Sequence, residues 1–145
     1  RVAGFFHVIN DVERLGDHAE NFYEIGAQMK EAGLQFSETA QNEIKNMVEK
    51  TTEMFDIALN VFTTRNTTKL ARLTELEKKV DLMKKYYTAS HFNRLATGDC
   101  QVEVGAYFFS TISGLERIAD HLINVGYSVL NPTGSQKIEP KIETL

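Results

Sequence analysis

Apolar residues recur along most of the chain at alternating spacings of three and four, which is the pattern of amphipathic helices. Four stretches show it, and they predict helices over residues 2–31, 38–64, 68–97 and 100–130. The best-defined stripes are Val8, Val12, Leu15, Phe22 and Met29; Met47, Thr51, Met54 and Val61; Leu73, Leu76 and Val80; and Phe108, Ile112, Leu115 and Leu122. No segment has the two-residue alternation of a strand.

Signals for helix ends lie between these stretches. Gly33 follows the first helix as a stop, Ser37 is a suitable N-cap for the second, and Asp99 is expected to cap the fourth. Because the connections are short, neighbouring helices must run antiparallel. The sequence therefore predicts an all-α, antiparallel up-down four-helix bundle over residues 1–131, followed by a flexible tail over 132–145.

Composition and charge narrow the possible functions. The 145 residues suit one domain, and the net charge of −4 argues against a nucleic-acid partner. A single cysteine, Cys100, excludes an internal disulfide and fits a reducing compartment. No apolar run reaches the ~20 residues of a membrane-spanning helix. The chain opens at Arg1, in the middle of a pattern, so we expect it to be a piece of a longer protein.

One motif occurs twice. The segment Glu-Arg-Leu-Gly-Asp-His at 13–18 returns as Glu-Arg-Ile-Ala-Asp-His at 116–121, so equivalent positions differ by 121 − 18 = 103. The flanking residues Phe5, Phe6, Ile9 and Asn21 return at the same offset as Phe108, Phe109, Ile112 and Asn124. One helical unit with one acidic pair is used twice.

Acidic residues four apart mark three of the predicted helices: Glu13 with Asp17, Glu77 with Asp81, and Glu116 with Asp120. Each pair projects from one helical face beside the apolar stripe, where two like charges are unfavourable. Counting along the helices places acids of all four at a similar height. A bound cation would relieve the repulsion, because carboxylate oxygens suit hard metals. Salt bridges to nearby Lys and Arg are the alternative; Glu53 and Asp56 are expected to be solvated.

The remaining candidate residues are expected to have structural roles. His18 and His121 are expected to cap a neighbouring carbonyl or carboxylate, and His91 to lie on the surface or anchor a loop. The four paired phenylalanines, Phe5, Phe6, Phe108 and Phe109, are expected in the core. Cys100 has no evident catalytic partner. No phosphate-binding glycine loop and no nucleophile with a base is apparent.

Several segments carry a family likeness. Leu76-Glu77-x-x-Val80-Asp81 is followed by His91-Phe92-Asn93-Arg94-Leu95-x-x-Gly98-x-Cys100, and then by Gly105-x-x-Phe108 and the motif at 115–121 with Asn124. With these residues the chain resembles the PhoU family of phosphate-uptake regulators. The likeness is greatest to the cytoplasmic C-terminal PhoU-like domain of bacterial sodium/phosphate cotransporters. It is specific over residues 68–130 and weak over the second helix.

The resemblance implies a fold of three-helix repeats, in which residues 37–131 form one repeat and residues 2–31 the last helix of a preceding one. It implies transition-metal ligands at Glu77, Asp81, Glu116 and Asp120, with Glu13 and Asp17 in second place. The metal would be of the iron or zinc type, multinuclear in some members, and a purified fragment can lack it.

The resemblance further implies a non-enzymatic, cytoplasmic regulatory domain that controls phosphate transport. Its partner would be a transporter membrane domain or a signalling protein, and a homodimer is left open. Two other functions remain as alternatives. A metal-free interaction bundle would use the acids only in salt bridges. A carboxylate-bridged di-iron enzyme is least favoured, because the Glu-x-x-His spacing of such sites is absent.

Overall fold

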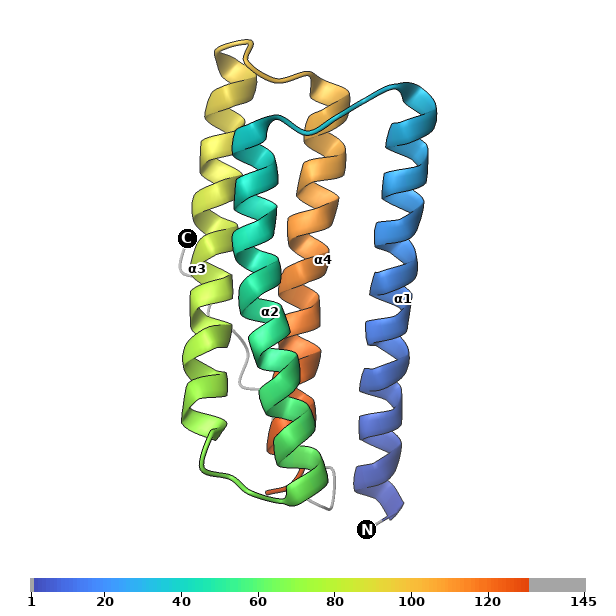
Figure 1. The fold of residues 1–145 in the computed structure, drawn as a ribbon, viewed down its shortest axis with the longest axis vertical. Helices are drawn as coiled ribbons and strands as arrows, with labels where there is room; N and C mark the ends of the chain where they lie inside the picture. Colours follow the sequence, from blue (N-terminus) through green and yellow to red (C-terminus); the bar gives the residue numbers. More distant parts are fainter. Residues whose placement is uncertain (1, 131–145) are drawn as a thin grey trace.

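Four long α-helices make up the fold in the computed structural model, which describes residues 2–130 and the side chains of 6–130 (Figure 1). They are α1 (Val2–Ala32), α2 (Glu38–Thr64), α3 (Leu70–Ala96) and α4 (Val102–Tyr127). Each helix runs antiparallel to the one before it (Figure 1). The predicted all-α, up-down four-helix bundle is confirmed. The predicted tail, 132–145, lies outside the described residues.

Local chemistry explains where the helices begin and end. The Ser37 hydroxyl accepts the backbone N–H of Ala40 at 3.1 Å, so Ser37 caps α2 as predicted. Gly33 has φ +67°, a left-handed conformation that ends α1 at little cost. The cap predicted for α4 is wrong, because its N-cap is Gln101. Asp99 instead accepts the Thr97 hydroxyl at 2.6 Å and stabilises the preceding turn.

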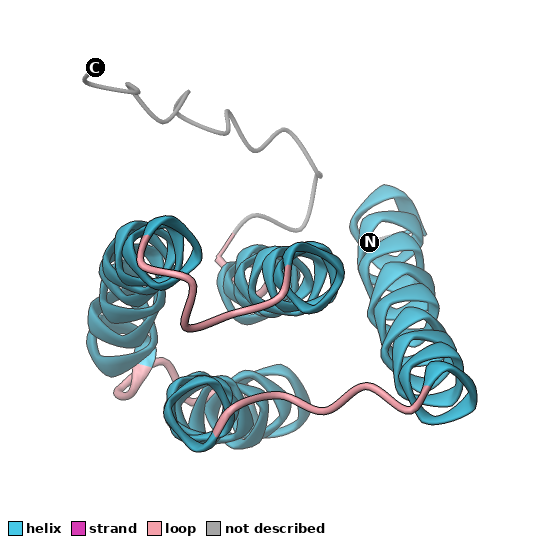
Figure 2. Ribbon diagram, turned by 90° about the horizontal axis from the view of Figure 1, so that it is seen from above, coloured by secondary structure: helices cyan, strands magenta, loops and turns pink. Residues whose placement is uncertain are grey.

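Helix α4 occupies the centre of the packing. It contacts the other three helices, and α2 also contacts α3, whereas within residues 2–130 α1 packs against α4 alone (Figure 2). The core is formed by the predicted stripes, whose most buried large side chains are Met47, Met54, Leu73, Leu76, Phe108, Ile112 and Leu122. Gly126 lets α3 approach closely, since a Cβ there would lie 2.4 Å from Leu73. α2, α3 and α4 are therefore a three-helix unit with α1 added to one side.

Only part of the stripe predicted on α1 is buried. Val8 and Met29 are buried and Leu15 and Phe22 are partly buried, whereas Val12 is 55% exposed. The prediction that Phe6 lies in the core is wrong, because it is 67% exposed. The physical reason is that α1 has a single helical neighbour among the described residues and can bury only one face.

Among the described residues, no helix combines the length and the apolar character needed to cross a membrane. Each long helix has one buried face and one exposed face, as expected for a helix that packs on one side only.

Candidate metal centre

Helices α3 and α4 supply the acids of the candidate metal centre. Glu77 and Asp81 stand one turn apart on α3, and Glu116 and Asp120 stand one turn apart on α4. Each acid is next in sequence to a buried apolar residue: Leu76, Val80, Leu115 and Ala119 respectively. Because these apolar residues pack in the core shared by the two helices, the acids lie at its edge, partly shielded from water.

Three of these acids come together. Glu77, Asp81 and Asp120 each offer a carboxylate oxygen, and the three oxygens lie within 4.8 Å of one another. Two unit charges 4 Å apart repel by about 4 kcal/mol at the effective dielectric of a protein surface. Each of the three carboxylates also has a further interaction within the described structure. The oxygens match the hard-ligand set of a cation bound between two helices.

Glu116 lies beside this group and is not part of it. Its carboxylate accepts the Lys84 ammonium of α3 at 3.0 Å, and its side chain is only 18% exposed. The ion pair ties α4 to α3 next to the three acids. Lys84 also supplies one positive charge in a region of four negative ones. The salt-bridge interpretation therefore holds for Glu116.

The other predicted ligand pair is placed elsewhere. Glu13 and Asp17 are exposed on α1, and neither belongs to a group of three possible metal ligands among the residues with described side chains. Glu53 pairs with Arg72 at 2.9 Å, with both side chains about two-fifths exposed, as expected for a solvated acid. The predicted set of six acids thus divides into three that converge, one neighbour and two distant residues.

The two motif histidines meet at the contact between α1 and α4. Their rings, His18 and His121, lie 5.6 Å apart between centroids. His121 Nδ1 lies 2.9 Å from an Asp11 carboxylate oxygen, in agreement with the expectation that it caps a carboxylate. Burial, and then the neighbouring His121, lowers the pKa of His18. Since the two histidines are equivalent in the repeat, α1 and α4 pack through corresponding faces.

Sequence reasoning missed a second polar cluster, where α2 meets the end of α3. His91 is 1% exposed, so the prediction that it lies on the surface is wrong; its ring stacks on Phe108 at 4.4 Å. Arg94 Nη2 lies 2.9 Å from His91 Nδ1, and His91 Nε2 lies 3.4 Å from Cys100 Sγ. A guanidinium can only donate, so Nδ1 accepts and Nε2 carries the proton toward the sulfur. His91 thereby anchors the loop before α4.

Glu43 of α2 completes this cluster. It is 7% exposed and forms an ion pair with Arg94. Arg94 acts on this buried carboxylate through a poorly directed side-chain hydrogen bond and through its charge. Burial raises the pKa of Glu43, and Arg94 opposes that rise. Burial, followed by the nearby Arg94 charge, lowers the pKa of His91. The available sequence signal was the His91-x-x-Arg94 spacing, which places both on one helical face.

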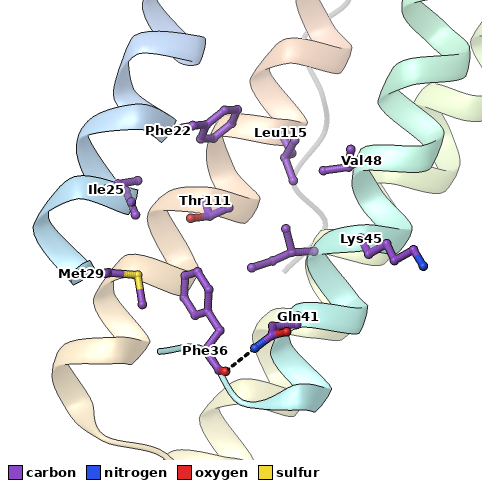
Figure 3. Close-up of a pocket in the computed structure, with 11 residues that line it drawn as sticks. Phe22, Ile25, Met29, Phe36, Gln41, Lys45, Val48, Thr111 and Leu115 are labelled. Atoms are coloured by element: carbon purple, nitrogen blue, oxygen red, sulfur yellow. Dashed lines mark hydrogen bonds between the residues drawn. The ribbon is translucent and has the colours of Figure 1, made fainter. Parts of the chain in front are cut away.

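An apolar cavity of about 430 Å³ lies where α1, α2 and α4 diverge (Figure 3). Its walls include Phe22, Ile25 and Met29 of α1, Ile44 and Val48 of α2, and Leu115 of α4. Phe36, in the loop between α1 and α2, closes one side, and its carbonyl accepts the Gln41 amide at 2.8 Å. No set of charged groups converges on the cavity, so its lining does not indicate a catalytic site.

Comparison with known proteins identifies the family. The model of the PhoU domain matches residues 44–129, which is more than half of the chain and covers most of α2 with all of α3 and α4. The chain belongs to the PhoU domain family. The converging acids lie within the matched region, whereas α1 lies outside it. Membership of a family of regulatory accessory proteins supports the prediction that the chain is not an enzyme.

A curated relative gives further context. The chain is 26% identical over 121 residues to the phosphate-specific transport system accessory protein PhoU homolog 1 of Thermotoga maritima. The match covers 83% of this chain and 51% of the relative, so the chain spans about half of that protein's length. No solved structure matches the chain.

Proposed function

We propose that this chain is a metal-binding regulatory domain of phosphate transport, acting at the cytoplasmic face of a transporter. The observation that carries the metal site is the convergence of Glu77, Asp81 and Asp120 from two helices onto one point. Family membership and the name of the Thermotoga relative support the link to phosphate transport. The proposed closer likeness to the C-terminal domain of sodium/phosphate cotransporters rests on the matching segments between Leu76 and Asn124.

The donor atoms favour certain metals. Three carboxylates form an all-oxygen set, which fits iron, manganese or magnesium better than an ion that needs thiolate or imidazole. Zinc accepts carboxylates but is usually completed by nitrogen or sulfur. Glu116, one turn from Asp120 on α4, is a further oxygen donor, and Lys84 would have to release it before it could bind.

A metal bound here would change the mechanics of the domain. It would join α3 to α4 across the edge of the core and replace repulsion between carboxylates by attraction to a shared ion. Since α4 contacts every other helix, a change in its packing reaches both α1 and α2. The site is thus placed where metal occupancy can alter the surfaces that a transporter or signalling protein would contact.

Metal analysis of protein purified without chelator tests the site. We expect bound transition metal in the wild type and its loss in the double variant D81N/D120N. The matched control is E20Q/E24Q, which neutralises two exposed acids four apart on α1. Equal metal content in the wild type and D81N/D120N would overturn the ligand assignment.

A test in cells addresses the transport role. We expect D81N/D120N, introduced into the full gene product, to alter how phosphate uptake responds to external phosphate, while E20Q/E24Q leaves it unchanged. An unaltered response in D81N/D120N, with the protein folded and present at normal amounts, would contradict regulation through this site.

A metal-free interaction bundle is the second candidate, and the Lys84–Glu116 ion pair favours it. It predicts a thermal midpoint that is the same with iron, manganese, zinc or chelator. Metal binding predicts a higher midpoint with the bound ion. The ion adds RT ln(1 + [metal]/Kd) to the free energy of unfolding, or about 2.7 kcal/mol at a hundredfold excess over Kd.

A further inference from the structure

The fold holds the apolar cavity between α1, α2 and α4 open. Within residues 2–130, α1 packs against α4 and not against α2, so the two helices stand apart on this side (Figure 2). The loop between them is anchored, because the ring of Phe36 meets that of Phe108 edge to face at 6.3 Å between centroids. Phe36 also packs against Ile25 and Met29, which are buried on α1. The walls of the cavity are therefore fixed by the folded chain itself.

The mouth of the cavity lies between α1 and α2. The lining residues that are exposed to solvent are Gly26 of α1 and Gln41, Lys45 and Val48 of α2. Buried apolar side chains of α1 and α4 form the floor. The volume of about 430 Å³ is in the range of small-molecule sites. Preformed cavities with such a lining take up apolar molecules in preference to water.

Lys45 is the polar lining side chain that remains available to a ligand. The Thr111 hydroxyl donates to the Tyr107 carbonyl at 2.8 Å, and the Gln41 amide donates to the Phe36 carbonyl at 2.8 Å. Among the residues with described side chains, none forms an ion pair with Lys45. Its stem lines the mouth and its ammonium extends outward (Figure 3). The cavity thus combines an apolar interior with one unpaired cation outside its mouth.

This arrangement discriminates between classes of occupant. An extended peptide would bring N–H and C=O groups against a lining that offers them no partners, which is unfavourable. A small inorganic ion would find no converging charges inside. An alkyl chain needs no polar partner, and a carboxylate at its end can stay in water at the mouth. The flexible stem of Lys45 lets its ammonium follow that carboxylate.

We propose that this cavity binds the single alkyl chain of a fatty acid, with the carboxylate beside the Lys45 ammonium. The chain lies on the floor formed by Ile25, Met29 and Leu115 and passes Gly26 and Val48 at the mouth. Occupancy connects α1 with α2, which do not contact each other directly. The ligand therefore fixes the position of α1 against the rest of the bundle. The site shares no residue with the three converging acids of α3 and α4.

Calorimetric titration of the 145-residue chain at neutral pH tests the alkyl chain. The probes are octanoate, decanoate and dodecanoate, each below the concentration at which it forms micelles. We expect one site per chain, with an affinity that rises more than about tenfold for every two methylenes, because each buried methylene strengthens binding roughly fourfold. An affinity that does not depend on chain length would overturn the proposal.

Two matched pairs of variants locate the ligand. A Cβ at Gly26 or at Gly16 would meet no atom within 4 Å, so both positions of α1 accept a larger side chain, and only Gly26 lines the cavity. We expect G26L to weaken decanoate binding about tenfold or more, since its leucine takes the space of at least two methylenes. G16L should bind as the wild type does. Circular dichroism should show unchanged helix content in both variants.

The second pair tests the carboxylate. K45Q should weaken decanoate binding about threefold, the size of an exposed ion pair, and leave the binding of uncharged decanol unchanged. K85Q removes an exposed lysine of α3 outside the cavity and should alter neither. Equal loss of decanoate and decanol binding in K45Q, or no loss of either, would contradict the contact with the carboxylate.

Three results would assign the cavity to another occupant or to none. G26L that binds decanoate as tightly as the wild type would place the ligand elsewhere. A wild-type dimer in sedimentation that G26L makes monomeric would show that a second copy covers the mouth. Binding to phosphatidylglycerol vesicles without binding of monomeric decanoate would show a membrane surface in place of a free fatty acid. Each of these outcomes overturns the proposal.

Discussion

Replacing Arg94 by methionine should destabilise the fold in a strongly pH-dependent way. The substitution keeps the length and apolar stem of the side chain and removes the charge that faces Glu43. Glu43 is then a buried carboxylate without its cation, which typically costs ~3–5 kcal/mol. Protonation limits this loss, because a buried carboxylate can take up a proton instead of remaining charged.

The pH sets the largest loss of stability that remains once Glu43 can take up a proton. The ordinary pKa of Glu43 is 4.5. Holding the group protonated at pH 7 costs about 1.36 × 2.5, or about 3.4 kcal/mol, and at pH 5 only about 0.7 kcal/mol. We therefore expect R94M to lose ~3 kcal/mol at pH 7 and under ~1 kcal/mol at pH 5. With an entropy of unfolding near 0.3 kcal/mol per degree for 145 residues, 3 kcal/mol lowers the midpoint by roughly 10 °C.

The sign is consistent with linkage. A carboxyl whose folded pKa is raised binds more protons in the folded than in the unfolded state, so its contribution to stability declines as pH rises from 4.5 through the folded pKa. Removing Arg94 removes an interaction that lowers this pKa. The decline should therefore extend to higher pH in R94M than in the wild type.

Urea unfolding followed by circular dichroism at pH 5 and pH 7 measures the effect. The matched control is R72M, which breaks the exposed pairs with Glu53 and Glu75 and should change stability little at either pH. The double variant E43L/R94M should recover most of the loss, because it removes both charges. This reasoning would be refuted if R94M lost the same free energy of unfolding at both pH values. It would also be refuted if E43L/R94M were no more stable than R94M at pH 7.

Three further predictions concern the fold. I112A should cost ~2–5 kcal/mol by denaturant unfolding and I9A under ~1 kcal/mol, because only Ile112 is buried; equal losses would contradict the environments described. G126A should destabilise by ~1–3 kcal/mol, since its Cβ would meet a leucine at 2.4 Å, whereas G16A should be neutral or stabilising in the same denaturant unfolding. His91, with its lowered pKa, binds fewer protons when folded, so stability should fall as pH drops below 6.5; H91F should flatten this part of the profile, and an unchanged slope would count against it.

Most of the fold could be predicted from periodicity. The stripes of α2, α3 and α4 become the core because each helix has neighbours on its apolar side. The stripe of α1 was only half right, because periodicity shows that a face is apolar and not whether another helix covers it. Val12 and Leu15 carry the same signal in sequence and differ in burial for that reason.

The candidate metal centre was predictable in part. Spacing of four placed Glu77 with Asp81 on one face, and the antiparallel topology brought Asp120 to them. Nothing in the spacing distinguished Glu116, because its pairing with Lys84 depends on the rotation of α3 against α4. The Glu43–Arg94 pair was missed for a related reason, since its partners lie on different helices and neither belongs to a repeated motif.

The repeat separates what a motif encodes from what its surroundings decide. Both copies fold as helices, both place a histidine at the α1–α4 contact, and both carry an acid pair on the adjoining face. The α4 copy faces a helix that brings further carboxylates, and among the residues with described side chains three such oxygens converge only there. The motif therefore supplies half of the candidate site, and a second helix with its own acid pair supplies the other half. On this reasoning, changing Glu13 and Asp17 to Gln and Asn should leave the metal content of the chain unaltered.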